Sequence, residues 1–83
     1  MDLWQLHIFV SVVENKSFSK ASAAINLSQP TVSSHIKELE DYFDARLLNR
    51  LGKTTEPTQA GRILYQYARE LLILRDRTES ALH

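Results

Sequence analysis

The stretch from Ser28 to Phe43 has the pattern that most restricts how this chain can fold. Its apolar residues recur at spacings of four, three and four, as on one face of a helix: Val32, Ile36, Leu39 and Phe43. Ser28 is a favourable N-cap, and Pro30 falls in the first turn, where a missing N–H group costs nothing. The sequence therefore predicts an amphipathic helix over residues 29–43.

Charge is distributed unevenly along this helix. Residues 28–37 contain one lysine and no acid, whereas residues 38–44 contain four acids. A helix N-terminus has free N–H groups and the positive end of the helix dipole, so the first half suits phosphates and base edges in the DNA major groove. Considered alone, the segment still favours an ordinary core helix. The DNA interpretation therefore depends on the segments around it.

Two shorter helices are predicted before this segment. An apolar stripe indicates a helix over residues 3–14, and Asp2 and Gln5 form a weak capping box at its start. The stripe consists of Leu3, Leu6, Val10 and Val13, with Phe9 beside it. Ser17 is placed to cap a second helix over residues 18–25.

A short helix, a turn and a longer helix form a helix-turn-helix. Asn26 suits the left-handed position at the turn between the two helices. In this motif the second helix enters the groove, and the first lies across the DNA backbone. The residues at the start of the first motif helix would therefore face phosphate: Ser17, Ser19 and Lys20.

Residues 44–57 have a different character. Two short extended runs on either side of Leu51-Gly52 predict a β-hairpin. Arg50 and Lys53 flank its tip. A basic hairpin beside a helix-turn-helix is a wing, which we place at residues 47–56. The alternative is a surface loop whose charges are only solvated.

The last segment predicts one long helix from Thr58 to about Ala81. Gly61 inside this helix costs about 1 kcal/mol relative to alanine, which indicates close packing at that position. The helix carries a stripe with spacings of three and four that favours a partner helix, and hence a homodimer. The stripe comprises Leu64, Tyr67, Leu71, Leu74, Thr78 and Ala81. The alternative is that the first half packs on the core and the second half frays.

Composition limits the classes of function. The 83 residues suit one small domain, and they contain ten basic and ten acidic residues, so charges must be segregated in space for the chain to bind DNA. There is no cysteine, no metal-ligand spacing and no glycine-rich phosphate loop. We therefore predict neither an enzyme nor a cofactor. No apolar run approaches 18 residues and no leader pattern is present, so we expect no membrane segment and a cytoplasmic protein.

Several motifs resemble the N-terminal part of LysR-type transcriptional regulators, in order and over nearly the whole chain. They are Phe18-Ser19-Lys20-Ala21-Ser22, Leu27-Ser28-Gln29-Pro30-Thr31-Val32-Ser33, Ile36-Lys37-Glu38-Leu39-Glu40, Leu47-Leu48-Asn49-Arg50 and Pro57-Thr58-Gln59-Ala60-Gly61. The resemblance implies a mainly α, winged helix-turn-helix domain at residues 1–57, with a three-helix core and a short hairpin. It also implies a linker and dimerisation helix at residues 58–83, and an effector-binding domain elsewhere in the full-length bacterial regulator.

The resemblance also implies roles for individual residues. Base contacts would come from the first turns of the recognition helix, at Gln29, Pro30, Ser33 and Ser34. Phosphate contacts would come from Thr31 and Lys37. Lys53 would enter the minor groove, with Thr54 beside it and Arg50 supporting the wing or a phosphate. Two positions lower the positive charge relative to the family pattern, because Ser34 often corresponds to arginine and Thr54 to a second basic residue.

Two kinds of function remain open from the sequence. The first is a DNA-binding domain that recognises a palindromic operator as a homodimer. The second is a helix-turn-helix module for protein interaction or dimerisation without DNA binding. The zero net charge favours the second kind. The small hydrogen-bond donors at the helix tip and the basic wing favour the first.

Overall fold

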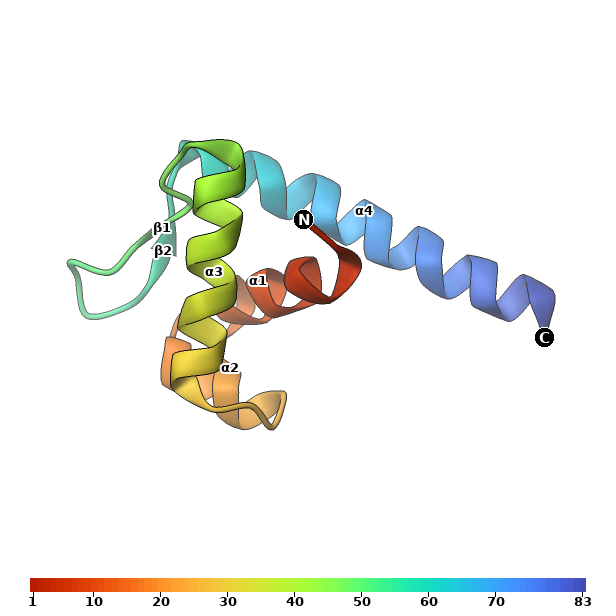
Figure 1. Ribbon diagram of the computed structural model, residues 1–83, viewed down its shortest axis with the longest axis horizontal. Helices are drawn as coiled ribbons and strands as arrows, with labels where there is room; N and C mark the ends of the chain where they lie inside the picture. Colours follow the sequence, from red (N-terminus) through yellow and green to blue (C-terminus); the bar gives the residue numbers. More distant parts are fainter.

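Four helices and a two-stranded hairpin make up the chain in the computed structural model, which describes residues 1–83 (Figure 1). The elements are α1 (Leu3–Asn15), α2 (Phe18–Ala24), α3 (Gln29–Phe43), β1 (Leu48–Asn49), β2 (Glu56–Pro57) and α4 (Gln59–Leu82). The strands are antiparallel, with Leu48 opposite Pro57 and Asn49 opposite Glu56. The predicted winged helix-turn-helix with a long C-terminal helix is confirmed.

The helices begin at the side chains that the sequence predicts as N-caps. An oxygen of Asp2, Ser17, Ser28 or Thr58 accepts a hydrogen bond from the backbone N–H three residues later, over 2.8–3.2 Å. Asn26 adopts the predicted left-handed conformation, with φ at 57°. The capping box at α1 forms only in part, because no hydrogen bond joins the Gln5 side chain to Asp2 and its amide reaches α3 instead.

Helix α1 lies at the centre of the core, between α2, α3 and α4 (Figure 1). Because it is covered on several sides, its buried surface is wider than one stripe and includes Ile8 and Val12. The predicted stripe is wrong at Leu3, which is exposed in the first turn of α1. On α3, the predicted burial of Phe43 is also wrong, because this last-turn residue is 40% exposed at the edge of the core.

The first half of α4 packs on the core, and the second half projects from it (Figure 1). Ala68 and Leu72 are buried in the same apolar cluster as α1 and α3. A polar contact lies beside them, where the Glu14 carboxylate accepts hydrogen bonds from Tyr65 at 2.7 Å and from Arg69 at 2.6 Å. The hydrogen bond to Glu14 raises the pKa of the Tyr65 hydroxyl and that of the Arg69 guanidinium. These contacts join α4 to the last turn of α1 and add to the apolar packing between the two helices.

Gly61 occupies a position where α4 touches the chain before the hairpin. A Cβ atom on Gly61 would lie 2.0 Å from the backbone oxygen of Leu47. The same oxygen accepts a hydrogen bond from the N–H of Thr58 at 3.0 Å. The close packing that the sequence predicts at Gly61 is therefore confirmed. None of the helices has both the length and the apolar surface needed to cross a membrane.

Candidate nucleic-acid interface

The first turns of α3 present polar side chains to solvent. Gln29, Pro30, Thr31 and Ser34 are exposed, and Ser33 is half-buried. The hydroxyl of Ser28 donates to Thr31 Oγ1 at 2.8 Å, which leaves the Thr31 hydroxyl hydrogen free for another acceptor. This end of the helix therefore offers hydrogen-bond donors and carries no carboxylate.

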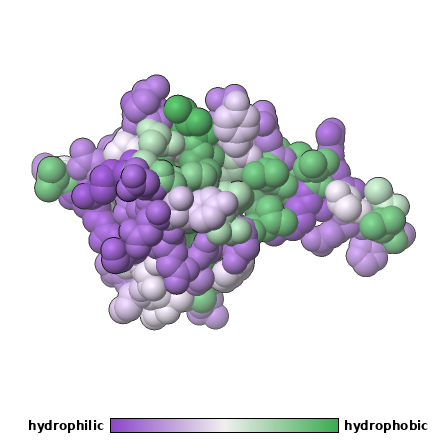
Figure 2. All heavy atoms as spheres, turned by 45° about the horizontal axis from the view of Figure 1, so that its top comes forward, coloured by the Kyte–Doolittle hydropathy of each residue, from purple (hydrophilic) through white to green (hydrophobic).

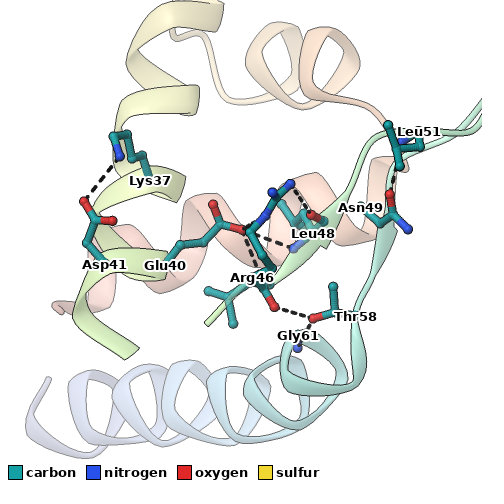
Figure 3. Close-up of polar contacts among 10 residues, drawn as sticks. Lys37, Glu40, Asp41, Arg46, Leu48, Asn49, Leu51, Thr58 and Gly61 are labelled. Carbon is teal, nitrogen blue, oxygen red and sulfur yellow. Dashed lines mark hydrogen bonds and ion pairs between the residues drawn. The ribbon is translucent and has the colours of Figure 1, made fainter. Parts of the chain in front are cut away.

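The acids of α3 are held by neighbouring groups of the protein (Figure 3). The Glu40 carboxylate accepts the N–H of Leu47 at 2.8 Å and lies 3.6 Å from Arg46 Nε. Asp41 lies 3.6 Å from Lys37 Nζ, and both of these side chains remain largely exposed. The negative charge in the second half of α3 is thus partly compensated within the domain.

The hairpin has a longer connection than the sequence predicts. Residues 50–55 join the two strands, so the predicted hairpin around Leu51-Gly52 is present, with four further residues in its connection. The tip is instead ordered by side chains, because Asn49 Oδ1 accepts the N–H of Leu51 at 3.2 Å and Thr54 donates to Glu56 at 3.1 Å. Lys53 is exposed in this loop. The pairing extends the predicted wing by one residue, to Pro57.

Two contacts attach the wing to the helical body. The guanidinium carbon of Arg50 lies 3.5 Å from the centroid of the Phe18 ring, so the charge stacks on the aromatic face. The N–H of Thr55 donates to the backbone oxygen of Lys16 at 3.0 Å. The wing is therefore joined to the turn before α2, beside the N-terminus of α3.

A polar cleft lies between the wing and the starts of α2 and α3; we call it the wing cleft. It brings together six of the predicted site residues: Ser17, Ser19, Gln29, Arg50, Lys53 and Thr54. A second hollow beside it contains Ser33 and Lys37 and shares Arg50. The remaining predicted residues, Lys20, Pro30, Thr31 and Ser34, are exposed outside both hollows.

Apolar side chains gather along α4 and over the adjoining part of the body in Figure 2. Within the predicted stripe, Leu64 is half-buried, whereas Tyr67, Leu71, Leu74, Thr78 and Ala81 are exposed. Part of this stripe lines a wholly apolar groove, which we call the α4 groove. Its lining is Met1, Phe43, Ala45, Leu47, Ala60, Ile63, Leu64, Tyr67 and Leu71.

Sequence reasoning missed three contributors to these surfaces. Glu40 binds the backbone before the wing, Phe18 holds Arg50, and Phe43 belongs to the α4 groove rather than to the core. No local signal predicts these roles, since each one depends on a residue that is distant in the sequence or on the angle between two elements.

The chain is similar to bacterial transcriptional regulators. The model of the family described as "Bacterial regulatory helix-turn-helix protein, lysR family" matches residues 3–62. The regulator CysL of Bacillus subtilis is 42% identical over 78 residues, which cover 94% of this chain and 26% of CysL. The regulator XapR of Escherichia coli is 42% identical over 72 residues, or 87% of this chain and 24% of XapR. The chain thus spans about a quarter of the length of these relatives.

Solved structures match almost the whole chain. The BenM DBD in its complex with catB site 1 DNA has a TM-score of 0.96 and 38% identity, covering 99% of this chain and 91% of that one. Full-length CbnR complexed with its target DNA has a TM-score of 0.91 and 30% identity, covering 98% of this chain and 28% of CbnR.

Proposed function

The chain belongs to the lysR family of bacterial regulatory helix-turn-helix proteins, and we propose that it binds a palindromic DNA operator as a homodimer. Its fold is that of the family's DNA-binding domain. In this proposal, α3 reads bases in the major groove, and Lys53 enters the neighbouring minor groove. The family is one of transcriptional regulators rather than enzymes.

One observation carries the proposal: Gln29 and Lys53 line the same wing cleft. A major groove and the adjacent minor groove of a duplex are separated by a single phosphate backbone. The wing cleft has Gln29, proposed to contact the major groove, on one wall and Lys53, proposed to contact the minor groove, on the other. One phosphate backbone strand could therefore lie in the cleft between them. Ser17, Ser19 and Arg50, which also line it, would supply the donors for phosphate.

The zero net charge is compatible with this arrangement. The tip of α3 carries no acid, and the acids further along it contact Lys37, Arg46 and the backbone of Leu47. Lys20, Lys37, Arg50 and Lys53 provide the positive charge of the proposed DNA face. The proposal requires that these charges outweigh the neighbouring acids at the DNA face, although Asp41 pairs with Lys37 and lines a hollow with it.

The exposed stripe of α4 supports a second copy as its partner. Tyr67, Leu71 and Leu74 leave apolar surface uncovered, and the α4 groove continues this surface onto the end of α3. We infer that residues 58–83 link two DNA-binding units of residues 1–57. The full-length protein would carry a C-terminal effector-binding domain and act in the cytoplasm, where the DNA is.

Selection of bound duplexes from a random library tests the proposed function. We expect enrichment of two inverted half-sites, with recognition-helix centres one or more DNA turns apart. Binding to bulk duplex should weaken steeply with salt. A protein-interaction module would give no enriched sequence and no such salt dependence, and that result would favour the alternative function.

Gln29→Ala is expected to relax the sequence preference at one base pair in each half-site. The Gln29 side chain is exposed at the tip of α3, and a bidentate glutamine–adenine contact contributes about 1–3 kcal/mol of discrimination. The measurement is the binding-site profile of the variant. Gln66→Ala, on the exposed side of α4, should leave the profile unchanged. An identical profile for Gln29→Ala would remove Gln29 from the set of base-reading residues.

Alanine at Lys37, Arg50 or Lys53 is expected to lower the affinity for specific and for random DNA duplexes by similar factors. Each change should lower the slope of log K against log salt by about 1, if the side chain neutralises one phosphate. Titrations at several salt concentrations measure this slope. Arg77→Ala is the control, because it also removes one positive charge but lies near the projecting end of α4. It should not change the slope of log K against log salt. Three unchanged slopes would contradict the proposed role of this basic surface.

A further inference from the structure

A buried amide connects α1 to the recognition helix. Gln5 is only 7% exposed, although glutamine is a polar residue. Its Nε2 lies 3.2 Å from His35 Nδ1 and donates a hydrogen bond to Glu38 Oε2. The two partners lie one turn apart on the same side of α3. Gln5, on α1, therefore contacts α3 at two side chains, although it lies 30 residues before His35 in the chain.

The chemistry of the amide fixes the roles of these atoms. An amide nitrogen has two hydrogens and only donates, so His35 Nδ1 must be the acceptor. Both hydrogens of the Gln5 amide are directed to α3, one toward the ring and the other toward the carboxylate. The contact is thus directional, unlike the apolar contacts around it.

A second polar contact lies on the other flank of α3. Glu40 accepts hydrogen bonds from the N–H groups of Leu47 and Leu48, at 2.8 and 3.5 Å. At 100° per residue, His35 and Glu40 lie about 70° to either side of the buried stripe of α3. Close packing of the buried stripe already restricts the rotation of α3 about its axis, but it leaves room for small adjustments, and polar contacts on both flanks restrict these further. The two flanking contacts therefore act together with the apolar packing in setting this rotation.

We propose that Gln5 is a positioning residue for base reading, which sets the rotation of α3 through His35 and Glu38. The inference rests on the proposed function. Side chains reach about 5–6 Å from a helix axis, so a rotation of about 10° moves their tips by about 1 Å. Hydrogen bonds tolerate only about 0.5 Å of variation in length. Base contacts are therefore sensitive to this rotation, whereas flexible lysines can still reach phosphate.

Gln5→Leu tests the inference, because leucine keeps an apolar body of similar size and removes both hydrogen bonds. His35 and Glu38 are not fully buried, so water can replace the amide and the variant should still fold. The duplex enriched by selection and a random duplex of the same length are the two probes. We expect the dissociation constant of the selected duplex to rise by about tenfold, as for the loss of one good base contact, so that the ratio of the random to the selected constant falls by the same factor. Affinity for the random duplex, set by phosphate contacts, should be unchanged.

Ser11→Ala is the matched control. Ser11 is also a buried polar residue of α1, but its hydrogen bonds stay within that helix, with Asn15. It should leave both affinities unchanged. A variant without a cooperative unfolding transition is not natively folded. If Gln5→Leu behaves in this way, His35→Leu replaces it in the test, because it removes part of the same contact from the α3 side.

The inference is wrong if the folded variant keeps the native ratio, or if it loses affinity for both duplexes equally. The second result would assign Gln5 to general stability. If the native chain itself enriches no sequence, the proposed function is wrong, and the inference is overturned with it. The behaviour of the native chain thus separates the two failures.

Discussion

Replacing Gly61 with alanine is expected to destabilise the fold by about 2 kcal/mol. Alanine is the better helix former by about 1 kcal/mol, but the added methyl group would lie 2.0 Å from the Leu47 oxygen. That oxygen is backbone and also accepts the N–H of Thr58, so it cannot move without disturbing the start of α4. Overpacking of this kind costs about 1–3 kcal/mol and sometimes more. For a domain of this size, 2 kcal/mol corresponds to a fall in Tm of about 8–16 °C.

Gly52→Ala provides the control for this prediction. Gly52 is the only other glycine, and its added Cβ would meet nothing closer than the Thr54 oxygen at 3.8 Å. Its effect should stay within about 0.5 kcal/mol. Thermal unfolding followed by circular dichroism measures both variants at one protein concentration. Equal Tm values for the two variants would show that the contact between α4 and Leu47 can relax.

Leu71→Asp is expected to dissociate the proposed dimer without unfolding the monomer. Leu71 is 40% exposed in the single chain, so an aspartate at this position can remain hydrated there. In a helix–helix seam the same carboxylate would be buried without a partner, at a cost of several kcal/mol. The dimer dissociation constant should therefore rise by at least about a hundredfold. Sedimentation at micromolar concentrations measures this change directly.

DNA binding separates this effect from a loss of fold. Affinity for a single half-site should survive, because α3 and the wing are unchanged, whereas affinity for the palindrome should fall through lost avidity. Gln66→Asp introduces the same charge on another exposed side of α4 and should preserve the dimer. A native chain that stays monomeric at tens of micromolar and on DNA would contradict the proposed dimer.

Local signals in the sequence predict most of the fold. A capping side chain begins each helix, Asn26 ends the α2 segment, and the apolar spacing of α3 gives both its range and most of its buried side. Gly61 indicates a close approach because a glycine inside a helix costs stability that close packing can offset. These features depend on residues within a few positions of one another, so a single sequence contains the information.

The contacts between elements could not be predicted in the same way. Glu40 is an ordinary acid in the sequence, and only the path of the chain after α3 brings the Leu47 N–H group to its carboxylate. In the sequence Arg50 is one more charge of the wing, and only the position of α2 brings the Phe18 ring against its guanidinium. The exposure of Phe43 has the same origin, because it depends on the angle at which α4 passes the end of α3. The roles in DNA contact and dimerisation that the resemblance implies stay predictions.

The projecting part of α4 has a mechanical consequence. The helix has 24 residues, a length of about 36 Å, and contains neither glycine nor proline after Gly61. The one side-chain bond into its own backbone, from Thr78 Oγ1 to the Leu74 oxygen at 2.8 Å, lies near the C-terminal end, so most of the helix should behave as a stiff lever. A tilt of about 5° at one end would displace the other by about 3 Å, which is comparable to the rise of one base pair. A small change of angle at the far end of α4 would thus move the DNA-contacting body along the duplex by about one base pair.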